Sequence, residues 1–168
     1  MTGEIAVDLF FYGTLRDTDV RRIVLGPVAD RLPVEPALIR GYRCAPTAGG
    51  RYPILVPEAA SRAEGVVVAG VGIEAAARTS YFEDDGYAYG VGRVAVETAS
   101  GAALTAWAFL PLERLIPSPG RWSIEDWKRR HRAVFVADAR RAMARCGTVA
   151  LERYRENWRV RAADRAGA

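Results

Sequence analysis

The chain has 168 residues, half of them hydrophobic, with 24 basic and 20 acidic side chains and a net charge of +4. A chain of this length fits one domain with its own hydrophobic core. Its apolar residues come in short runs such as Val66-Val67-Val68, whereas a membrane span needs roughly 18 or more consecutive apolar positions. The amino terminus also lacks the pattern of a signal peptide, so we expect a cytoplasmic protein that does not contact a membrane.

Two cysteines and a single histidine limit the chemistry available to the chain. Cys44 and Cys146 are too few and too far apart for a disulfide framework or a zinc site, and we expect both to be reduced, partly buried thiols. His131 and Asp138 fall on the apolar side of a predicted helix, where a hydrogen-bonded structural role is favoured over a catalytic one. Acid or base catalysis therefore depends on carboxylates.

The amino-terminal part of the chain predicts strands separated by tight turns. Residues 7–12 form an apolar run that ends at Gly13, which indicates a buried strand followed by a turn. Residues 19–25 predict a short amphipathic helix that ends at Gly26-Pro27. Prolines at both ends predict that residues 52–57 lie at a sheet edge or run extended beside a pocket. The glycines within the strand predicted over residues 64–73 indicate curvature, which favours a barrel. The remaining predicted strands are 37–44, 92–98 and 104–110, the last two joined by a hairpin turn at Ser100-Gly101.

From Ser123 onward the hydrophobic period changes to that of a helix. Ser123 is a natural N-cap and Gly147 the expected C-cap of one long helix. Residues 148–160 predict a second helix, which docks on the barrel with Tyr154 and Trp158. The apolar stripe of the long helix consists of Ile124, Trp127, His131, Val134, Phe135, Ala139, Ala142, Met143 and Cys146.

Several arginines of the long helix are expected on its solvated face. Aromatic side chains do not alternate with them, as a stacking platform for bases would require, so a nucleic-acid partner is disfavoured. These arginines are Arg129, Arg130, Arg132, Arg140, Arg141 and Arg145.

The first stretch that can carry chemistry is Phe10-Phe11-Tyr12-Gly13-Thr14-Leu15-Arg16, where a hydrophobic strand becomes a glycine-containing turn. Glycine at such a point lets the backbone turn sharply and approach a ligand closely. Successive N–H groups are then free to bind an anion such as a carboxylate. An ordinary strand-to-helix turn is the alternative interpretation.

The second stretch runs from Thr79 to Tyr89 and combines the acidic residues 83–85 with four aromatic side chains. A carboxylate beside apolar rings loses solvation, which raises its pKa and suits a group that exchanges protons near neutral pH. An acidic surface loop is the alternative interpretation.

Together the two stretches resemble the γ-glutamylcyclotransferase-like family, also called avirulence-induced-gene-like proteins. Its members have a strand that ends in Tyr-Gly-Ser/Thr-Leu, an extended segment like Tyr52-Pro53-Ile54-Leu55, and a strand like Glu64-Gly65-Val66-Val67-Val68. A glutamate follows about 70 residues after the first motif, as Glu83 does here. The resemblance covers about residues 7–111.

The resemblance implies an α+β fold built on a small, mostly antiparallel β-barrel with flanking helices. We assign residues 1–120 to this barrel domain and residues 121–168 to a C-terminal helical extension packed on it. The implied activity is cyclisation of a small-molecule γ-glutamyl amide to 5-oxoproline with release of an amine, and no metal or organic cofactor is implied. Glu83 is the implied general acid/base. The implied substrate-binding residues are Tyr12, Gly13, Thr14, Leu15, Pro53, Tyr87 and Tyr89.

Alternatives remain open for both the site and the function. Asp84 stands where the family usually has glycine, and Asp84 or Asp85 is an alternative catalytic carboxylate. The same scaffold can serve an enzyme for another small amide or amine, or a non-catalytic module that binds a small molecule or a protein through the arginine-rich helix. The carboxy-terminal helices lie mostly outside the resemblance, and they affect substrate choice if they cap the pocket.

Overall fold

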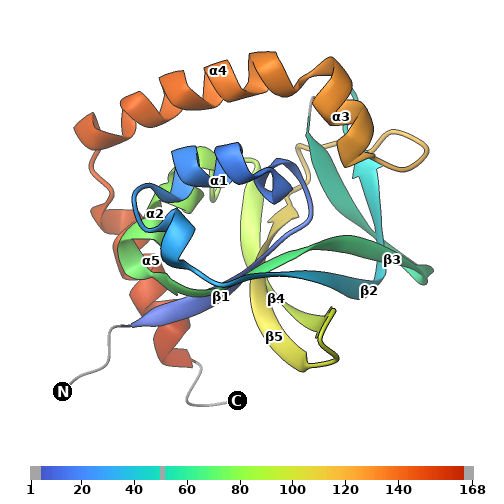
Figure 1. The fold of residues 1–168 in the computed structure, drawn as a ribbon, viewed down its shortest axis with the longest axis horizontal. Helices are drawn as coiled ribbons and strands as arrows, with labels where there is room; N and C mark the ends of the chain where they lie inside the picture. Colours follow the sequence, from blue (N-terminus) through green and yellow to red (C-terminus); the bar gives the residue numbers. More distant parts are fainter. Residues whose placement is uncertain (1–4, 50–51, 165–168) are drawn as a thin grey trace.

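The computed structural model describes residues 5–49 and 52–164, which form five strands surrounded by helices (Figure 1). The strands close into a barrel in the order β1-β3-β2-β4-β5. Neighbouring strands run antiparallel except β1 and β5, which pair in parallel at Leu9 and Trp107, so the sheet is mixed. The predicted α+β class is confirmed. The strands are β1 (Ala6–Phe11), β2 (Val34–Pro46), β3 (Pro53–Gly72), β4 (Tyr89–Thr98) and β5 (Ala103–Pro111).

Strand β3 is one continuous strand of 20 residues, where the sequence predicted two separate segments. Its first part, residues 53–57, pairs only with β2, and its last part pairs with β1. Prolines are tolerated in that first part because an edge strand has backbone groups without ladder partners. The predicted edge position is therefore confirmed, and the two segments are joined through an irregular register opposite Gly41.

The helices are α1 (Thr18–Leu25), α2 (Ile73–Phe82), α3 (Ile124–Arg130), α4 (Arg132–Ala144) and α5 (Glu152–Ala163), with the short 3-10 helices η1 (Thr14–Arg16), η2 (Ala29–Arg31) and η3 (Cys146–Thr148). The sequence did not predict α2, although its residues 74–78 are strong helix formers. Arg78 of this helix donates hydrogen bonds to the carbonyl groups of Ile23 and Val24, at 3.0 and 2.8 Å, and so caps the end of α1.

The single long helix predicted after Ser123 is wrong, because the helix breaks at His131, whose φ is −127°. The break redirects the chain while keeping Trp127 and Phe135 in edge-to-face contact, with ring centroids 5.4 Å apart. Gly147 is not the C-cap, since α4 ends at Ala144 and continues into η3. Val134 is half exposed instead of lying on the buried stripe.

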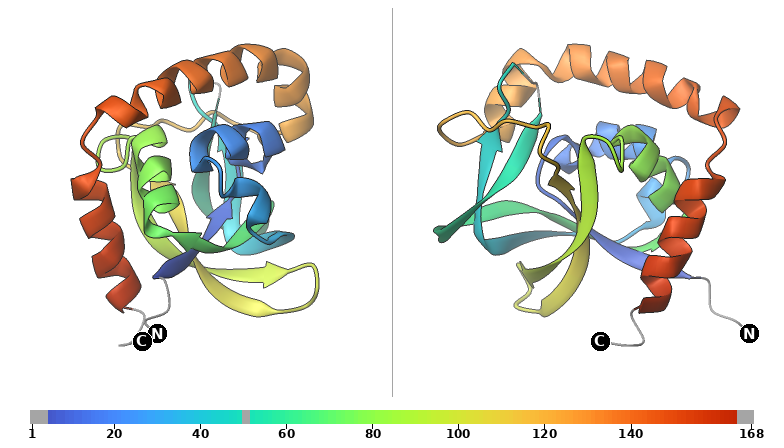
Figure 2. Two further views of the ribbon diagram at one scale, coloured as in Figure 1. Left: turned by 60° about the vertical axis from the view of Figure 1, so that its left-hand side comes forward. Right: turned by 180° about the vertical axis from the view of Figure 1, so that it is seen from behind.

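The carboxy-terminal helices cover one side of the barrel and the smaller helices. Helix α4 passes over α1 and α2, and α5 lies beside α2 (Figure 1 and Figure 2). Trp158 of α5 is fully buried against Trp107 and Phe109, and its indole N–H donates to Ser80 at 2.8 Å. This contact confirms the predicted docking of the last helix.

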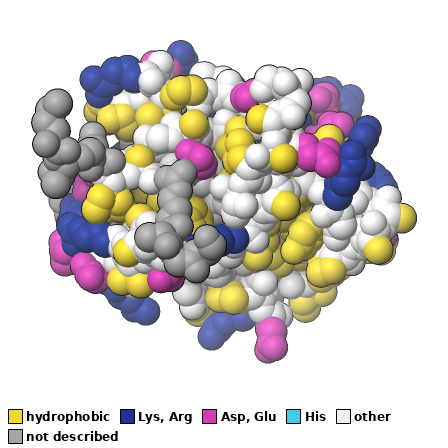
Figure 3. Space-filling view, turned by 90° about the horizontal axis from the view of Figure 1, so that it is seen from below, with side chains coloured by type: hydrophobic (Ala, Val, Ile, Leu, Met, Phe, Trp, Pro, Cys, Tyr) yellow, Lys and Arg dark blue, Asp and Glu magenta, His cyan; other side chains and the backbone are white. Residues whose placement is uncertain are grey.

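Charges of both signs are interspersed over the face shown in Figure 3, with no single basic patch on it. Two of the helix arginines also have acidic partners one turn away, Arg129 with Asp126 and Arg141 with Asp138. Within residues 5–49 and 52–164, no helix is both long and apolar enough to cross a membrane.

Candidate active site

The loop that follows β1 lies directly against β3. A Cβ atom added at Gly13 would lie 2.9 Å from Cγ of Pro53, and one added at Gly65 would lie 2.2 Å from the carbonyl oxygen of Phe11. Such distances leave no room for a side chain, so both positions require glycine for this close approach. Thr14 and Leu15 are buried, and the chain turns there into η1.

Asp17 fixes the far end of this loop. Its carboxylate accepts hydrogen bonds from the N–H groups of Asp19 and Val20, at 3.0 and 3.1 Å, and caps α1. Arg132 of α4 donates to the same carboxylate at 2.8 Å. Burial opposes ionisation of Asp17, but the hydrogen bonds from Arg132 and the backbone outweigh it and lower the pKa of the carboxyl. The carboxylate of Asp17 is therefore ionised and fully hydrogen-bonded, and it stabilises the fold.

Glu83 faces the loop from the other side of the barrel mouth, at the end of α2. Its N–H donates to the carbonyl of Thr79 at 2.9 Å, so it is the C-cap of the helix. Asp84 then takes a φ of +55°, a left-handed conformation that favours glycine. This geometry accounts physically for the glycine that the family pattern places there.

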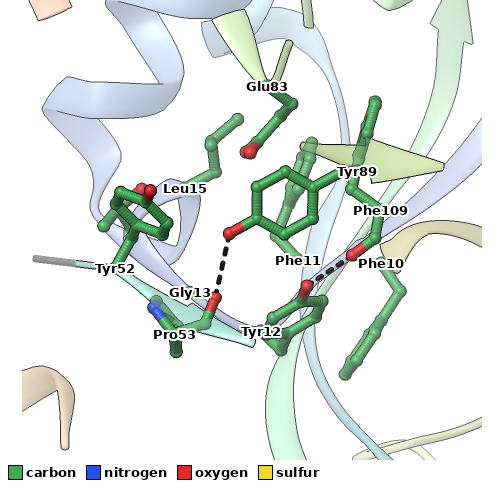
Figure 4. A pocket seen from close by; sticks show the side chains of 11 residues that line it. Phe10, Phe11, Tyr12, Gly13, Leu15, Tyr52, Pro53, Glu83, Tyr89 and Phe109 are labelled. Atoms are coloured by element: carbon green, nitrogen blue, oxygen red, sulfur yellow. Dashed lines mark hydrogen bonds between the residues drawn. The ribbon is translucent and has the colours of Figure 1, made fainter. Parts of the chain in front are cut away.

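The carboxyl group of Glu83 points into the pocket beside the ring of Tyr89 (Figure 4). In the part of the chain that the structure describes, no hydrogen bond or ion pair engages it. Burial raises the pKa of Glu83 from its usual 4.5 to about 8. Part of the residue remains exposed, so this mostly buried carboxyl can still be reached from the pocket.

The two neighbouring aspartates do not share this environment. Asp85 accepts a hydrogen bond from Ser80 at 2.9 Å and lies 3.4 Å from Arg161, so its carboxylate already has partners. Asp84 is exposed in the turn. Of the three consecutive acids, Glu83 is the one whose carboxyl combines burial with a free position facing the loop.

Two buried tyrosines build the walls of the pocket. Tyr12 donates its hydroxyl hydrogen to the carbonyl of Phe109, and Tyr89 donates to the carbonyl of Pro53 at 3.1 Å (Figure 4). Burial raises the pKa of both phenols, so both remain neutral donors. The bond to Pro53 ties the start of β4 to the strand that contacts Gly13.

The structure brings together seven of the eight residues expected at the site from the sequence, in a narrow pocket of about 30 Å³. Tyr87 is the exception, because its ring is 55% exposed and stacks against Arg114. Phe10, Phe11, Tyr52 and Phe109 also line the pocket but were not predicted as site residues. Phe10 and Phe11 stand in the same stretch as Tyr12, and Tyr52 stands beside Pro53, whereas Phe109 had no local signal. The pocket is lined by Phe10, Phe11, Tyr12, Gly13, Thr14, Leu15, Tyr52, Pro53, Glu83, Tyr89 and Phe109.

Metal ligation and thiol chemistry have little structural basis in the described residues. They contain no group of three or more His, Cys, Asp or Glu side chains placed to hold a metal ion. Cys44 and Cys146 are both free thiols. Burial raises the pKa of Cys44 to about 12, which leaves too little thiolate for nucleophilic catalysis near neutral pH.

Comparison with known proteins supports the same interpretation of the fold. AIG2-like protein C of Arabidopsis thaliana is 26% identical over 140 residues, which is 81% of this chain and 77% of that protein. AIG2-like protein A of the same plant is 27% identical over 139 residues, or 81% of each chain.

Solved structures share the fold at lower sequence identity. The solution structure of an Arabidopsis thaliana protein has a TM-score of 0.58 and 24% identity, covering 81% of this chain and 89% of its own. A structure described as gamma-glutamyl cyclotransferase has a TM-score of 0.50 and 16% identity, covering 92% and 86%. The family model described as "Gamma-glutamyl cyclotransferase, AIG2-like" matches residues 9–129. On this match and on the geometry of its barrel mouth, the chain belongs to the gamma-glutamyl cyclotransferase, AIG2-like family.

Proposed function

We propose that this chain is an enzyme that cyclises a small γ-glutamyl amide to 5-oxoproline and releases an amine, with Glu83 as general acid and base. The observation that carries the proposal is the free, buried carboxyl of Glu83 opposite the loop of residues 12–15. Family membership gives independent support for this class of reaction.

The raised pKa of Glu83 suits the proton transfers of such a cyclisation. A value of about 8 lies near that of an α-ammonium group, so a proton passes between the two at little cost. Glu83 takes a proton from the α-ammonium, and the neutral nitrogen attacks the γ-carbonyl carbon. The bond to the leaving nitrogen breaks as Glu83 returns the proton to it. The attacking nitrogen loses a second proton as the lactam forms, and the released amine takes up this proton. The products are therefore 5-oxoproline and an ammonium ion.

The remaining work of the site is positioning. A flexible γ-glutamyl chain must bring its own nitrogen and carbonyl carbon together, and holding them at reactive distance gives a large rate gain. The first N–H groups of η1, at Thr14 and Leu15, have no partner within the helix and are suited to the α-carboxylate of the substrate. Tyr12, Tyr89 and Pro53 form the rigid wall on which the substrate lies. Tyr87 has no part in this proposal.

The proposed partner is thus a small molecule, and we propose the cytoplasm as its location, where the free thiols Cys44 and Cys146 stay reduced. No metal or cofactor enters the proposed steps.

The test is release of 5-oxoproline, measured by mass spectrometry, from γ-glutamyl amino acids, peptides and alkylamines. We expect product from the native protein and from Asp84→Asn, and none from Glu83→Gln. Equal product from the native protein and Glu83→Gln would remove Glu83 from the mechanism. An absence of product from every substrate would contradict the proposed reaction.

A further inference from the structure

A second and larger cavity opens from the pocket that holds Glu83. Its volume is about 480 Å³, against about 30 Å³ for the inner pocket. The two cavities share Thr14, Tyr52, Glu83 and Tyr89 in their walls, so Glu83 lies where they meet. The inner pocket has room for only a small group, so a substrate whose reacting carbonyl is beside Glu83 extends into the outer cavity.

The outer wall of this cavity comes from α4, a helix that lies beyond the residues matched by the family model. Helix α4 crosses over the end of α2 (Figure 2). It contributes Phe135, Asp138, Ala139 and Ala142 to the cavity lining. The end of α2 supplies Phe82, whose ring lies against that of Phe135.

Contacts along its length hold α4 in a fixed position. Arg132 at its start binds Asp17 and Asp19. The ring of Phe135 packs edge-to-face on Phe82, with centroids 6.0 Å apart. Near its end, the hydroxyl of Tyr81 donates to the carbonyl of Ala142 at 3.2 Å. A wall fixed in this way selects ligands by shape, because it cannot move aside without breaking these contacts.

The surface that the wall presents is mainly apolar. Phe82 and Phe135 supply aromatic carbon, and the small side chains of Ala88, Ala139 and Ala142 leave the open space between them. The carboxylates of Glu83, Asp84 and Asp138 also line the cavity, and the five apolar side chains form the part of it that suits a hydrocarbon group of the size of a benzyl or branched alkyl chain.

We propose that α4 forms the leaving-group site and selects γ-glutamyl amides whose amine carries a bulky apolar group. The inference rests on the proposed cyclisation and goes beyond it by naming the substrate class. Ala142 is the specificity-determining residue, because it is partly exposed to the cavity and a longer side chain there narrows the cavity along α4.

The experiment compares γ-glutamyl phenethylamide with γ-glutamyl methylamide. We expect the native protein to have a kcat/KM at least tenfold higher for the phenethylamide, since burying the ring gains affinity only with this substrate. Ala142→Leu should lower kcat/KM for the phenethylamide about tenfold and change that for the methylamide less than twofold. Ala144→Leu, the same substitution on the exposed side of α4, should leave both values unchanged.

A second variant tests the wall in the opposite direction. Phe135→Leu removes part of the aromatic wall and should raise kcat/KM for a larger amide, γ-glutamyl naphthylmethylamide, relative to the phenethylamide. Equal kcat/KM for phenethylamide and methylamide in the native protein, or an equal loss with both in Ala142→Leu, would overturn the proposal.

Binding measurements separate this inference from the proposed reaction. Glutaric acid mono-phenethylamide lacks the attacking amine and cannot cyclise. We expect the native protein to bind it about tenfold more tightly than the mono-methylamide in calorimetry, and Ala142→Leu to abolish the difference. The same affinity for both compounds would refute the apolar leaving-group site, whether or not the protein forms 5-oxoproline.

Discussion

Two carboxylates flank the loop of residues 12–15 and have opposite environments. Asp17, at the start of α1, accepts hydrogen bonds from two backbone N–H groups and from Arg132, and its pKa is lowered. Glu83, at the end of α2, is buried without such partners, and its pKa is raised to about 8. The difference separates a carboxylate that stabilises the fold from one that can change charge near neutral pH, as the proposed proton transfer requires.

The largest effect is expected from removing the acid/base function of Glu83. Glu83→Gln keeps the shape of the side chain but cannot exchange the proton, so kcat should fall about 10³-fold. Affinity for the non-cyclising glutaric monoamides should stay within a few-fold of the native value. Steady-state kinetics and calorimetry measure the two quantities. A loss of affinity as large as the loss of kcat would instead assign Glu83 to substrate binding.

The next largest effect is expected from removing the carboxylate of Asp17, which should lower the stability of the fold. Asp17→Ala removes the N-cap of α1 and leaves Arg132 without its main partner, which should lower the free energy of unfolding by about 2–4 kcal/mol. Asp30→Ala is the matched control, because Asp30 pairs with Arg22 on the surface and should contribute less than about 1 kcal/mol. Urea unfolding followed by circular dichroism measures both. Similar losses of unfolding free energy in the two variants would show that the buried contacts of Asp17 stabilise the fold no more than a surface ion pair does.

The same contrast has a consequence for stability at different pH values. The folded protein holds the proton of Glu83 more tightly than the unfolded chain, so ionisation destabilises the fold as pH rises from 4.5 to about 8. The full shift corresponds to about 5 kcal/mol, and solvent access to the partly exposed side chain reduces it. Glu83→Gln lacks this penalty and should be more stable than the native protein by about 1–3 kcal/mol at pH 8.5, with little difference at pH 4. Thermal unfolding of both proteins across this pH range measures which of the two is the more stable. A native protein that is the more stable of the two at pH 8.5 would mean that Glu83 has a charged partner.

A smaller effect is expected where the loop touches β3. The added Cβ of Gly13→Ala would lie 2.9 Å from Pro53 and should displace the loop slightly, which lowers kcat/KM about tenfold. Gly147→Ala is the control, because nothing lies within 4 Å of a Cβ there. Unchanged kinetics in Gly13→Ala would show that the close approach of the loop to Pro53 does not position the substrate.

Local sequence patterns predicted the elements whose signal lies in neighbouring residues. The apolar runs of β1, β4 and β5 and the turn at Gly101 needed only neighbouring residues to be recognised. The glycine turn at Gly13 was also recognised from its neighbours. The expectation that Glu83 acts together with this loop came from the family resemblance.

The remaining features depend on contacts between distant parts of the chain. Helix α2 is held by Arg78 on the end of α1. On the two sides of the break at His131, Trp127 packs on Trp122 and Phe135 packs on Phe82. Tyr87 was placed with Tyr89 because both lie near Glu83, but β4 begins only at Tyr89, and Tyr87 belongs to the exposed turn before it. Phe109 enters the site from β5, through a hydrogen bond to Tyr12 that no local pattern reveals.

The availability of the Glu83 carboxyl for proton transfer is tested most directly by its titration in the empty protein. Carbon-13 NMR of protein labelled at the glutamate carboxyl carbons follows each group, and the Glu83 signal is the one missing from Glu83→Gln. We expect this signal to titrate near pH 8, and the acid limb of the pH profile of kcat/KM to have the same midpoint. A midpoint near 4.5 would contradict the assignment of Glu83 as a buried, partner-free acid and base.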